Sequence, residues 1–128
     1  GVAQVDVYGS QKFAVRVQVD PVAAAARNVS LDLCPTSNTQ AAIVPGYGDF
    51  PIAELRRRGV PITLNTDDLV VSDVTLSEEY LHVHRRLGLP VADLIDLART
   101  GYDFAFAEQG TKTRLRNALE TWLSQRGM

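Results

Sequence analysis

Two adjacent carboxylates, Asp67 and Asp68, stand where an apolar run of the sequence stops. The run before them, residues 60–65, is typical of a buried strand, and residues 69–71 after them indicate a return to the interior. We therefore expect the pair at the carboxyl end of a strand, where parallel α/β sheets usually place chemistry. Two carboxylates side by side repel each other unless a metal ion, a shared proton or a donor group holds them. We interpret the pair as a candidate functional site, and the alternative is that both residues only cap a helix and a turn.

Composition narrows the class of protein. The chain has 128 residues, of which 45% are apolar and 22% charged, and its formal charge is -2. These values predict a single domain over residues 1–128, without a basic surface for nucleic acid. No apolar run approaches the length of a transmembrane helix and no signal-peptide pattern opens the sequence, so we expect no membrane partner and a cytoplasmic location. Cys34 lies in an apolar run without a nearby histidine, and we interpret it as a buried structural thiol rather than a nucleophile.

The elements that must position the carboxylates alternate along the chain. Apolar and polar residues alternate over residues 13–19, and short apolar runs cover residues 29–34 and 60–65, which predicts three strands. Asp20 and Pro21 predict the start of a short helix between the first two strands.

Turn residues indicate where the remaining helices and loops begin and end. Residues 51–58 fit a helix that Gly59 ends, whereas residues 36–50 have the composition of a long loop. Residues 2–9 indicate the end of a helix. The order from residue 13 onward is thus β, α, β, loop, α, β.

Three helices are predicted after the last strand. Thr75 and Glu78 form a capping box at the start of the first of them, Gly88 ends it, and Pro90 opens the second. The third carries its apolar stripe on Leu115, Ala118, Leu119 and Trp122. The pattern predicts an α/β fold with three parallel strands, helices and a C-terminal helical segment.

Three motifs point to a family. They are Leu31-Asp32-Leu33-Cys34-Pro35-Thr36-Ser37-Asn38, Gly59-Val60-Pro61-Ile62-Thr63-Leu64-Asn65-Thr66-Asp67-Asp68 and Leu76-Ser77-Glu78-Glu79-Tyr80. Together they resemble the carboxyl-terminal part of the adenosine deaminase family, whose members are zinc-dependent aminohydrolases on an eight-stranded β/α barrel. The resemblance extends from about residue 20 to residue 108. It implies a partial (β/α) barrel in which the three predicted strands are the sixth to eighth.

The resemblance also implies roles for particular residues. The first aspartate of the family's Thr-Asp-Asp motif is a zinc ligand and the second hydrogen-bonds the purine ring, which assigns these roles to Asp67 and Asp68. Zinc is the implied cofactor and a purine nucleoside the implied substrate, because zinc turns water into the hydroxide that attacks the carbon bearing the amino group. Ser37 and Asn38 are expected to tie down the loop after their strand, with direct contact to the substrate as the alternative.

The sequence departs from the family pattern at three positions. Phe13 stands where the family has a catalytic histidine on its sixth strand, and Phe50 where a second histidine precedes a proline. Leu69 replaces the proline that usually follows the two aspartates. An aromatic ring fills a similar volume without ligating anything, so the two phenylalanines are typical of a site that has lost its water and metal. The family's other ligands, a His-x-His pair and a further histidine, and its glutamate proton shuttle belong to strands upstream of the matching residues.

His82 and His84 form a second candidate metal motif. On the predicted helix their side chains point about 200° apart, because successive residues turn by about 100°. We therefore do not expect them to bind one metal ion, and we interpret them as part of a solvated helix face.

Three parallel strands do not close a barrel, which needs about eight, and they leave unpaired edges. We therefore expect a partner, either a second chain or the missing N-terminal barrel half, or self-association, unless the chain forms a small open α/β sandwich. Three functions remain open. The first is a subunit or fragment of an adenosine deaminase-like aminohydrolase, inactive alone and completed in trans. The second is a catalytically dead binding or regulatory module, and the third is a structural assembly subunit.

Overall fold

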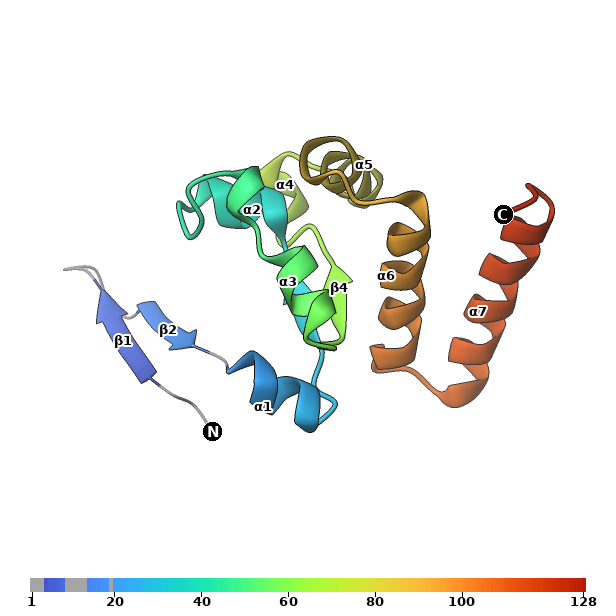
Figure 1. Ribbon diagram of the computed structural model, residues 1–128, viewed down its shortest axis with the longest axis horizontal. Helices are drawn as coiled ribbons and strands as arrows, with labels where there is room; N and C mark the ends of the chain where they lie inside the picture. Colours follow the sequence, from blue (N-terminus) through green and yellow to red (C-terminus); the bar gives the residue numbers. More distant parts are fainter. Residues whose placement is uncertain (1–3, 9–13, 19) are drawn as a thin grey trace. The chain divides into compact units, whose positions relative to one another are not determined.

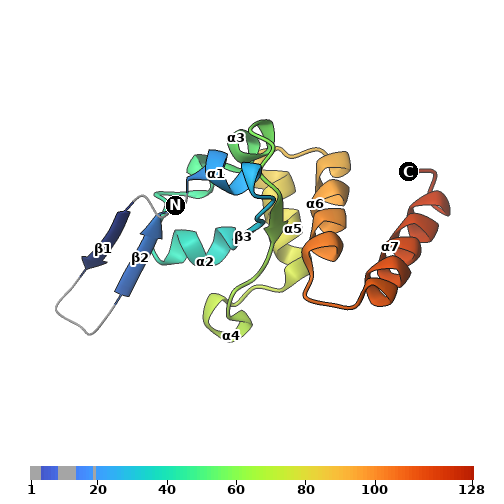
Figure 2. The ribbon, with the colours of Figure 1, turned by 90° about the horizontal axis from the view of Figure 1, so that it is seen from below.

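The computed structural model describes residues 4–8, 14–18 and 20–128, which fall into two compact units. The first unit contains the described residues up to 31 and residues 51–61. The second contains residues 32–50 and 62–128. Figures 1 and 2 show the ribbon in two orientations.

The first unit holds a β-hairpin and two short helices. Strands β1 (Gln4–Tyr8) and β2 (Ala14–Gln18) pair antiparallel. Helix α1 (Pro21–Ala26) begins at Asp20, whose carboxylate accepts the backbone N–H groups of the second and third helical residues. Helix α3 (Ile52–Arg57) is followed by Gly59, whose φ of 72° is the left-handed conformation that glycine adopts without steric cost.

Strands β3 (Leu31–Leu33) and β4 (Ile62–Leu64) form a second two-stranded sheet. The N–H of Leu31 donates to the carbonyl of Pro61 and the N–H of Asn65 donates to the carbonyl of Leu33, each at 2.9 Å. Residue numbers rise along both strands from the first bond to the second, so the pair is parallel. All three residues of β4 are buried, as expected of a strand in a parallel α/β sheet.

Short helical segments follow each of these strands in the second unit. Helix α2 (Pro35–Gln40) begins directly after β3, and the 3₁₀ helix η1 (Tyr47–Asp49) lies further along the same connection. Helix α4 (Leu69–Ser72) follows β4. The carboxyl ends of both parallel strands therefore run into short helices.

Three longer helices complete the second unit: α5 (Leu76–Leu87), α6 (Val91–Phe104) and α7 (Gln109–Ser124). The predicted capping box of Thr75 and Glu78 is present, and Gly88 ends α5 with a φ of 70°. Helix α6 packs along β4, and α7 packs against α6 (Figure 1). Leu97 of α6 is 1% exposed and belongs to this core.

Several predictions about the first half of the chain were wrong. The described residues contain two parallel strands rather than three, because β2 pairs antiparallel with β1 instead of joining β3. Residues 4–8 are a strand and not a helix end, and in its antiparallel register Val5 pairs with Val17 and Val7 with Val15. The predicted loop over residues 36–50 contains helical turns in α2 and η1.

Residues 69–71 do not return to the interior. Val70 is 91% exposed and Val71 is 76% exposed, because this apolar run forms the short helix α4 on the surface rather than a core segment. In the described part of the chain, no helix has the length and apolar character needed to cross a lipid bilayer.

The packing of α6 on β4 predicts a large stability effect at its centre. Leu97→Ala should lower the free energy of unfolding by about 2–5 kcal/mol, because it removes buried methyl groups and leaves a cavity. Urea denaturation followed by circular dichroism measures this change. Val70→Ala, at an exposed position, should change it by less than about 0.5 kcal/mol, and equal effects of the two substitutions would contradict the assigned core.

Candidate active site at the carboxyl ends of the parallel strands

Asp67 lies just beyond the carboxyl end of β4 and is joined to the segment that follows β3. The Ser37 hydroxyl donates to Asp67 Oδ2 at 2.7 Å. Asp67 has a φ of 61°, a left-handed backbone conformation that aspartate tolerates better than most residues. The turn at Asp67 therefore brings its carboxylate to α2, at the edge where the two parallel strands end.

Asp68 has a separate set of partners. Its Oδ1 accepts the backbone N–H groups of Val70 at 2.9 Å and Val71 at 3.1 Å, so its side chain caps α4. A carboxylate at a helix N-terminus interacts favourably with the helix dipole. The two adjacent carboxylates thus avoid mutual repulsion by engaging different donors, the Ser37 hydroxyl and the first turn of α4.

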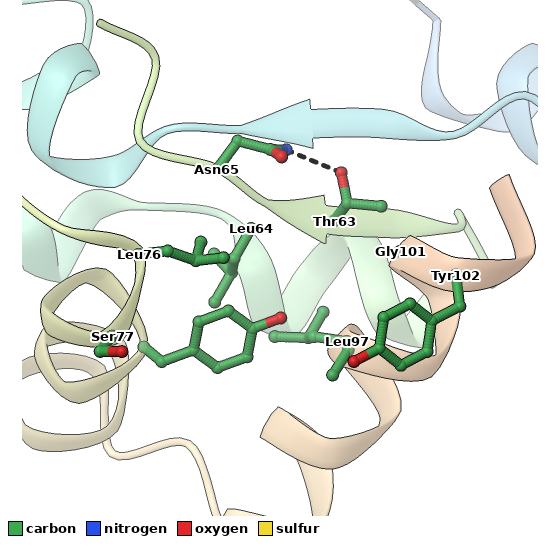
Figure 3. Close-up of a pocket in the computed structure, with 10 residues that line it drawn as sticks. Thr63, Leu64, Asn65, Leu76, Ser77, Leu97, Gly101 and Tyr102 are labelled. Atoms are coloured by element: carbon green, nitrogen blue, oxygen red, sulfur yellow. Dashed lines mark hydrogen bonds between the residues drawn. The ribbon is translucent and has the colours of Figure 1, made fainter. Parts of the chain in front are cut away.

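A chain of polar side chains crosses the two strands beside Asp67. The Thr63 hydroxyl donates to Asp32 Oδ1 at 2.6 Å, and Asn65 Nδ2 donates to the same hydroxyl oxygen at 2.8 Å. Figure 3 shows the Asn65–Thr63 contact. Thr63 is only 7% exposed, so this chain satisfies a buried hydroxyl and fixes Asp32 and Asn65 next to the strand ends.

A cavity of about 650 Å³ opens over these groups. Its lining includes Asp32, Cys34, Asn65, Asp67, Leu69 and Leu76. Carboxylate, amide and thiol groups therefore converge with apolar side chains at one concave place, as is usual for small-molecule sites.

Cys34 lines this cavity, and its thiol interacts electrostatically with two carboxylates of the same lining. Burial raises the pKa of the Cys34 thiol above its ordinary value, and the carboxylates of Asp67 and Asp32 raise it further, because they disfavour a nearby thiolate. The backbone N–H of Asp67 hydrogen-bonds the sulfur and acts in the opposite direction. Cys34 is half-buried rather than buried as predicted, since it lines the cavity, and its raised pKa disfavours the nucleophilic thiolate.

Ser37 and Asn38 do not act alike. The Ser37 side chain holds Asp67, whereas the Asn38 carbonyl accepts the backbone N–H groups of Ile43 and Val44 and so closes the chain after α2. The Ser37 contact is made by its side chain, whereas the Asn38 contact is made by the backbone and does not test a role for the Asn38 side chain.

Phe50 and Phe13 are the two phenylalanines at which the sequence departs from the family pattern. Phe50 is 9% exposed, so its ring is part of the core. Phe13 lies outside the described residues.

His82 and His84 have separate partners. His82 Nδ1 lies 3.3 Å from the Tyr47 hydroxyl, and His84 Nδ1 lies 2.7 Å from the carbonyl oxygen of Leu89. The two imidazoles therefore contact different neighbours. The interpretation of both as a solvated face was wrong for His82, which is half-buried and joins a polar network on α5.

The donor set bears on the metal that the family resemblance implies. Within residues 4–8, 14–18 and 20–128, no group of three or more His, Cys, Asp or Glu side chains lies close enough to hold a metal ion. Asp67 fits one ligand position, because a carboxylate is an ordinary zinc ligand. The described residues do not furnish a complete zinc site.

Two residues of this region have roles that the sequence alone did not predict. Asp32 is a polar residue between Leu31 and Leu33. This apolar-polar-apolar alternation indicates that Asp32 faces away from the apolar side of β3. Glu79 is fully buried on α5. Its position four residues before Val83, on the same helix face, indicates that it lies on the buried side of α5.

The sequence matches a family and its members over most of its length. Residues 21–122 match the family model described as adenosine deaminase. The chain is 37% identical over 98 residues to the aminodeoxyfutalosine deaminase of Streptomyces coelicolor, and 34% identical over 94 residues to the adenosine deaminase of Vibrio atlanticus. These matches cover 77% and 73% of this chain but 25% and 28% of the relatives. The chain thus spans about a quarter of the length of the curated relatives it matches.

Solved structures are similar to the chain as well. The adenine deaminase from Arthrobacter aurescens superposes with a TM-score of 0.77 at 23% identity, covering 81% of this chain and 32% of that one. The N6-methyl-AMP deaminase from Arabidopsis thaliana superposes with a TM-score of 0.70 at 31% identity, covering 76% and 29%. The fold of this chain is therefore shared with part of these deaminases, in agreement with a partial barrel.

The coupling between Cys34 and Asp67 predicts a change in thiol reactivity. Alkylation proceeds through the thiolate, so a raised pKa slows it at a fixed pH near 8. Asp67→Asn removes a charge that raises this pKa, and it should therefore speed the reaction of Cys34 with iodoacetamide in the presence of a chelator, with the rate profile moved to lower pH.

Asp68→Asn is the matched control, because asparagine caps a helix as well as aspartate does. Its rate should equal that of the unchanged chain. A faster rate in both variants would show that the Cys34 thiol responds to net charge or to loosening of the loop rather than to Asp67.

Proposed function

The chain belongs to the adenosine deaminase family, and we propose that it forms one part of an aminohydrolase site for a purine nucleoside, which further barrel strands complete. The observation that carries the proposal is the Ser37–Asp67 hydrogen bond, because it holds a carboxylate at the carboxyl ends of two parallel strands. Under this proposal the chain alone is inactive. The additional strands come from the missing N-terminal barrel half or from a second chain.

Asp67 is assigned to the metal in this proposal. The Ser37 hydroxyl occupies Oδ2, so Oδ1 is the oxygen that remains for ligation. Zinc, when bound, supplies a water acidic enough to act as a nucleophile at neutral pH. The other ligands come from outside the described residues, and what Ser37 contributes is a fixed orientation of the carboxylate.

Asp68 is assigned to the substrate. Its Oδ1 is held by the N-terminus of α4, and Oδ2 is the oxygen proposed to accept an N–H of the purine ring. The purine nucleoside is supported by the Vibrio relative, which is named for adenosine. The Arabidopsis structure is named for N6-methyl-AMP, a nucleotide, and supports the purine ring alone. Because α4 fixes Asp68 and Ser37 fixes Asp67, two neighbouring residues take two separate tasks.

Substitution of Asp67 tests the assignment. The chain is mixed with the part of the Vibrio atlanticus adenosine deaminase that it does not match, and ammonia release from adenosine is measured with and without zinc. Asp67→Asn should lower the rate at least about 100-fold. Loss of a residue that only supports a metal ligand costs about 10- to 100-fold, and loss of the ligand itself should cost at least the upper value.

Asp73→Asn is the control for this experiment. Asp73 is exposed and has a φ of 49°, a conformation that asparagine also adopts readily. Its activity should match that of the unchanged mixture. Equal activity of Asp67→Asn and Asp73→Asn would overturn the assignment of Asp67.

A binding module without turnover is a second candidate function. It is favoured by the buried Phe50, which stands where the family pattern has a histidine. In that case a purine nucleoside would bind the completed assembly, detected by calorimetry, while no ammonia is released at any zinc concentration.

The partner is proposed to dock beside β4. Among the described strands β4 pairs only with β3, and a second cavity of about 550 Å³ lies between β4, α5 and α6 (Figure 3). Its lining includes Leu64, Leu76, Tyr80, Leu97, Gly101 and Tyr102. Burial raises the pKa of Tyr80 to about 12, so its phenol stays neutral at physiological pH. An uncharged, largely apolar hollow next to a strand edge suits an added strand or a second copy of this chain.

Gly101 provides a test of this docking site. A Cβ at Gly101 would meet no atom within 4 Å, so the first atom of an added side chain has open space. Gly101→Glu should weaken association at least about tenfold, since docking would bury an unpaired charge. Sedimentation velocity of the chain, alone and with the complementary part of the Vibrio relative, measures the effect.

Gly110→Glu on α7 is the matched control, because a Cβ there also meets no atom within 4 Å. It should leave association unchanged. If both variants associate like the unchanged chain, the cavity beside β4 is not the docking site.

A further inference from the structure

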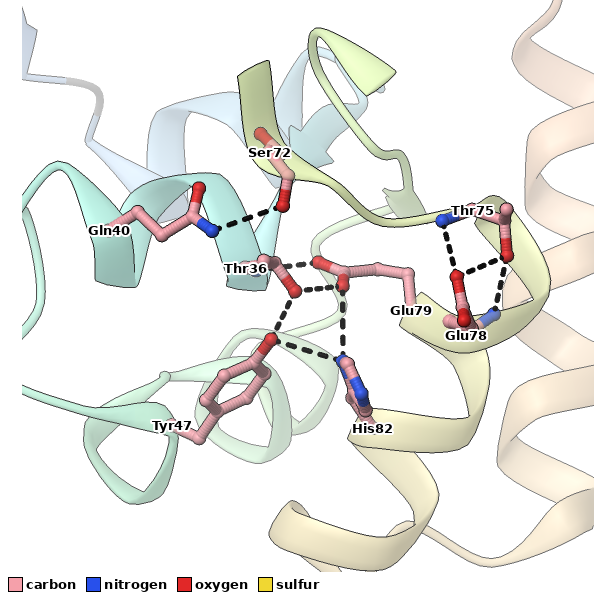
Figure 4. A network of polar contacts seen from close by, with 8 residues as sticks. All are labelled: Thr36, Gln40, Tyr47, Ser72, Thr75, Glu78, Glu79 and His82. Atoms are coloured by element: carbon pink, nitrogen blue, oxygen red, sulfur yellow. Dashed lines mark hydrogen bonds and ion pairs between the residues drawn. The ribbon is translucent and has the colours of Figure 1, made fainter. Parts of the chain in front are cut away.

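Glu79 is a fully buried carboxylate within α5, at 0% exposure. Burying a charged group is unfavourable unless hydrogen bonds compensate the lost hydration. Figure 4 shows Glu79 directed at the start of α2, beside Tyr47 of η1 and His82 of its own helix. Glu79 is not among the residues that line the cavity at Asp67.

Both oxygens of Glu79 are bound to one residue of α2. The backbone N–H of Thr36 donates to Oε1 at 2.7 Å, and the Thr36 hydroxyl donates to Oε2. The Tyr47 hydroxyl hydrogen-bonds the Thr36 hydroxyl in turn, and His82 Nδ1 lies 3.9 Å from Oε2. A bidentate contact of this kind fixes the position of Thr36 in all directions rather than along one bond.

The contact supplies a cap that α2 does not make for itself. Cys34 stands at the N-cap position of α2 and makes no side-chain capping hydrogen bond. Glu79 accepts the N–H of Thr36, in the first turn, and so does from 43 residues away what a local aspartate or serine usually does.

The first turn of α2 also carries the support of Asp67. Ser37 is the residue after Thr36, and its hydroxyl is the donor to Asp67 Oδ2. We propose that Glu79 is a positioning residue for Asp67: by clamping Thr36 it sets the direction of the Ser37 hydroxyl and hence the orientation of the Asp67 carboxylate. The inference rests on the proposed role of Asp67 as a metal ligand, and it adds a residue of α5 to the groups that orient this carboxylate.

Glu79→Gln tests the clamp with the least change of shape. The amide oxygen can still accept the Thr36 N–H, but the charge and the second acceptor oxygen are lost. The three-bond couplings that report the Asp67 χ1 angle are measured by NMR in the 128-residue chain. Zinc ions are titrated into its mixture with the complementary part of the Vibrio relative, which the proposal needs for the remaining ligands, and binding is followed at the Asp67 signals. We expect rotamer averaging at Asp67 and zinc affinity about tenfold to 100-fold lower.

Glu78→Gln is the matched control on the same helix. Glutamine retains the capping box with Thr75, and Glu78 contacts Thr75 rather than α2. The couplings and the zinc titration should be those of the unchanged chain. A merely structural role of Glu79 would lower stability while leaving the Asp67 rotamer unchanged in the folded protein, and that result overturns the proposal.

Thr36→Val decides the matter if Glu79→Gln does not fold. Valine matches threonine in shape and keeps the backbone N–H contact, while it removes the hydroxyl that binds Oε2. The Asp67 couplings should move in the same direction by a smaller amount, and unchanged couplings overturn the proposal.

The metal role of Asp67 and the clamp by Glu79 are rejected by different results. Averaging at Asp67 without zinc binding by any form rejects the metal role and keeps the clamp, whereas equal zinc binding by the unchanged chain and Glu79→Gln rejects the clamp alone.

Discussion

The hydrogen bond from the Ser37 hydroxyl to the Asp67 carboxylate joins the two segments that leave β3 and β4, and the candidate site depends on it. Asp67 has a left-handed backbone, which costs a residue other than glycine about 1–2 kcal/mol. A hydrogen bond to a charged group returns about 1.5–3 kcal/mol when protected from water, and less at an exposed side chain such as this one. The bond therefore offsets the backbone strain in part. Without the turn at Asp67, neighbouring carboxylates could not serve α2 and α4 separately.

The two helices that flank the site obtain their caps in different ways. Helix α4 is capped by Asp68, the residue directly before it, whereas α2 is capped by Glu79 of α5. A local cap forms as soon as the helix does, but a distant cap forms only when α5 has packed. The orientation of Asp67 is consequently a property of the whole second unit and not of the Thr-Asp-Asp motif alone. This is why the motif locates the site while the surrounding fold determines its geometry.

Local signals in the sequence predicted local structure well. Thr75 with Glu78 and the glycines at 59 and 88 mark helix ends correctly, because each acts through residues within one turn. Predictions that needed distant partners failed. The composition of residues 36–50 predicts a loop and does not reveal α2, because the cap of that helix is 43 residues away. The apolar residues 69–71 predict a buried segment, but they lie exposed on α4. Apolar character shows that a residue could be buried, but only the rest of the fold shows whether anything covers it.

The two faces of β4 bear on what an added strand would have to supply. Ile62 and Leu64 are buried at 2% and 4% exposure, and α6 packs along the strand. On the other face, the Thr63 hydroxyl is satisfied by Asp32 and Asn65, so it needs no further polar partner. What the described sheet leaves incomplete is then the backbone at its two outer edges, because β3 and β4 pair only with each other among the described strands. A partner that presents an extended segment meets this need directly, whereas one that presents only an apolar helix face would leave the edge N–H and C=O groups to water.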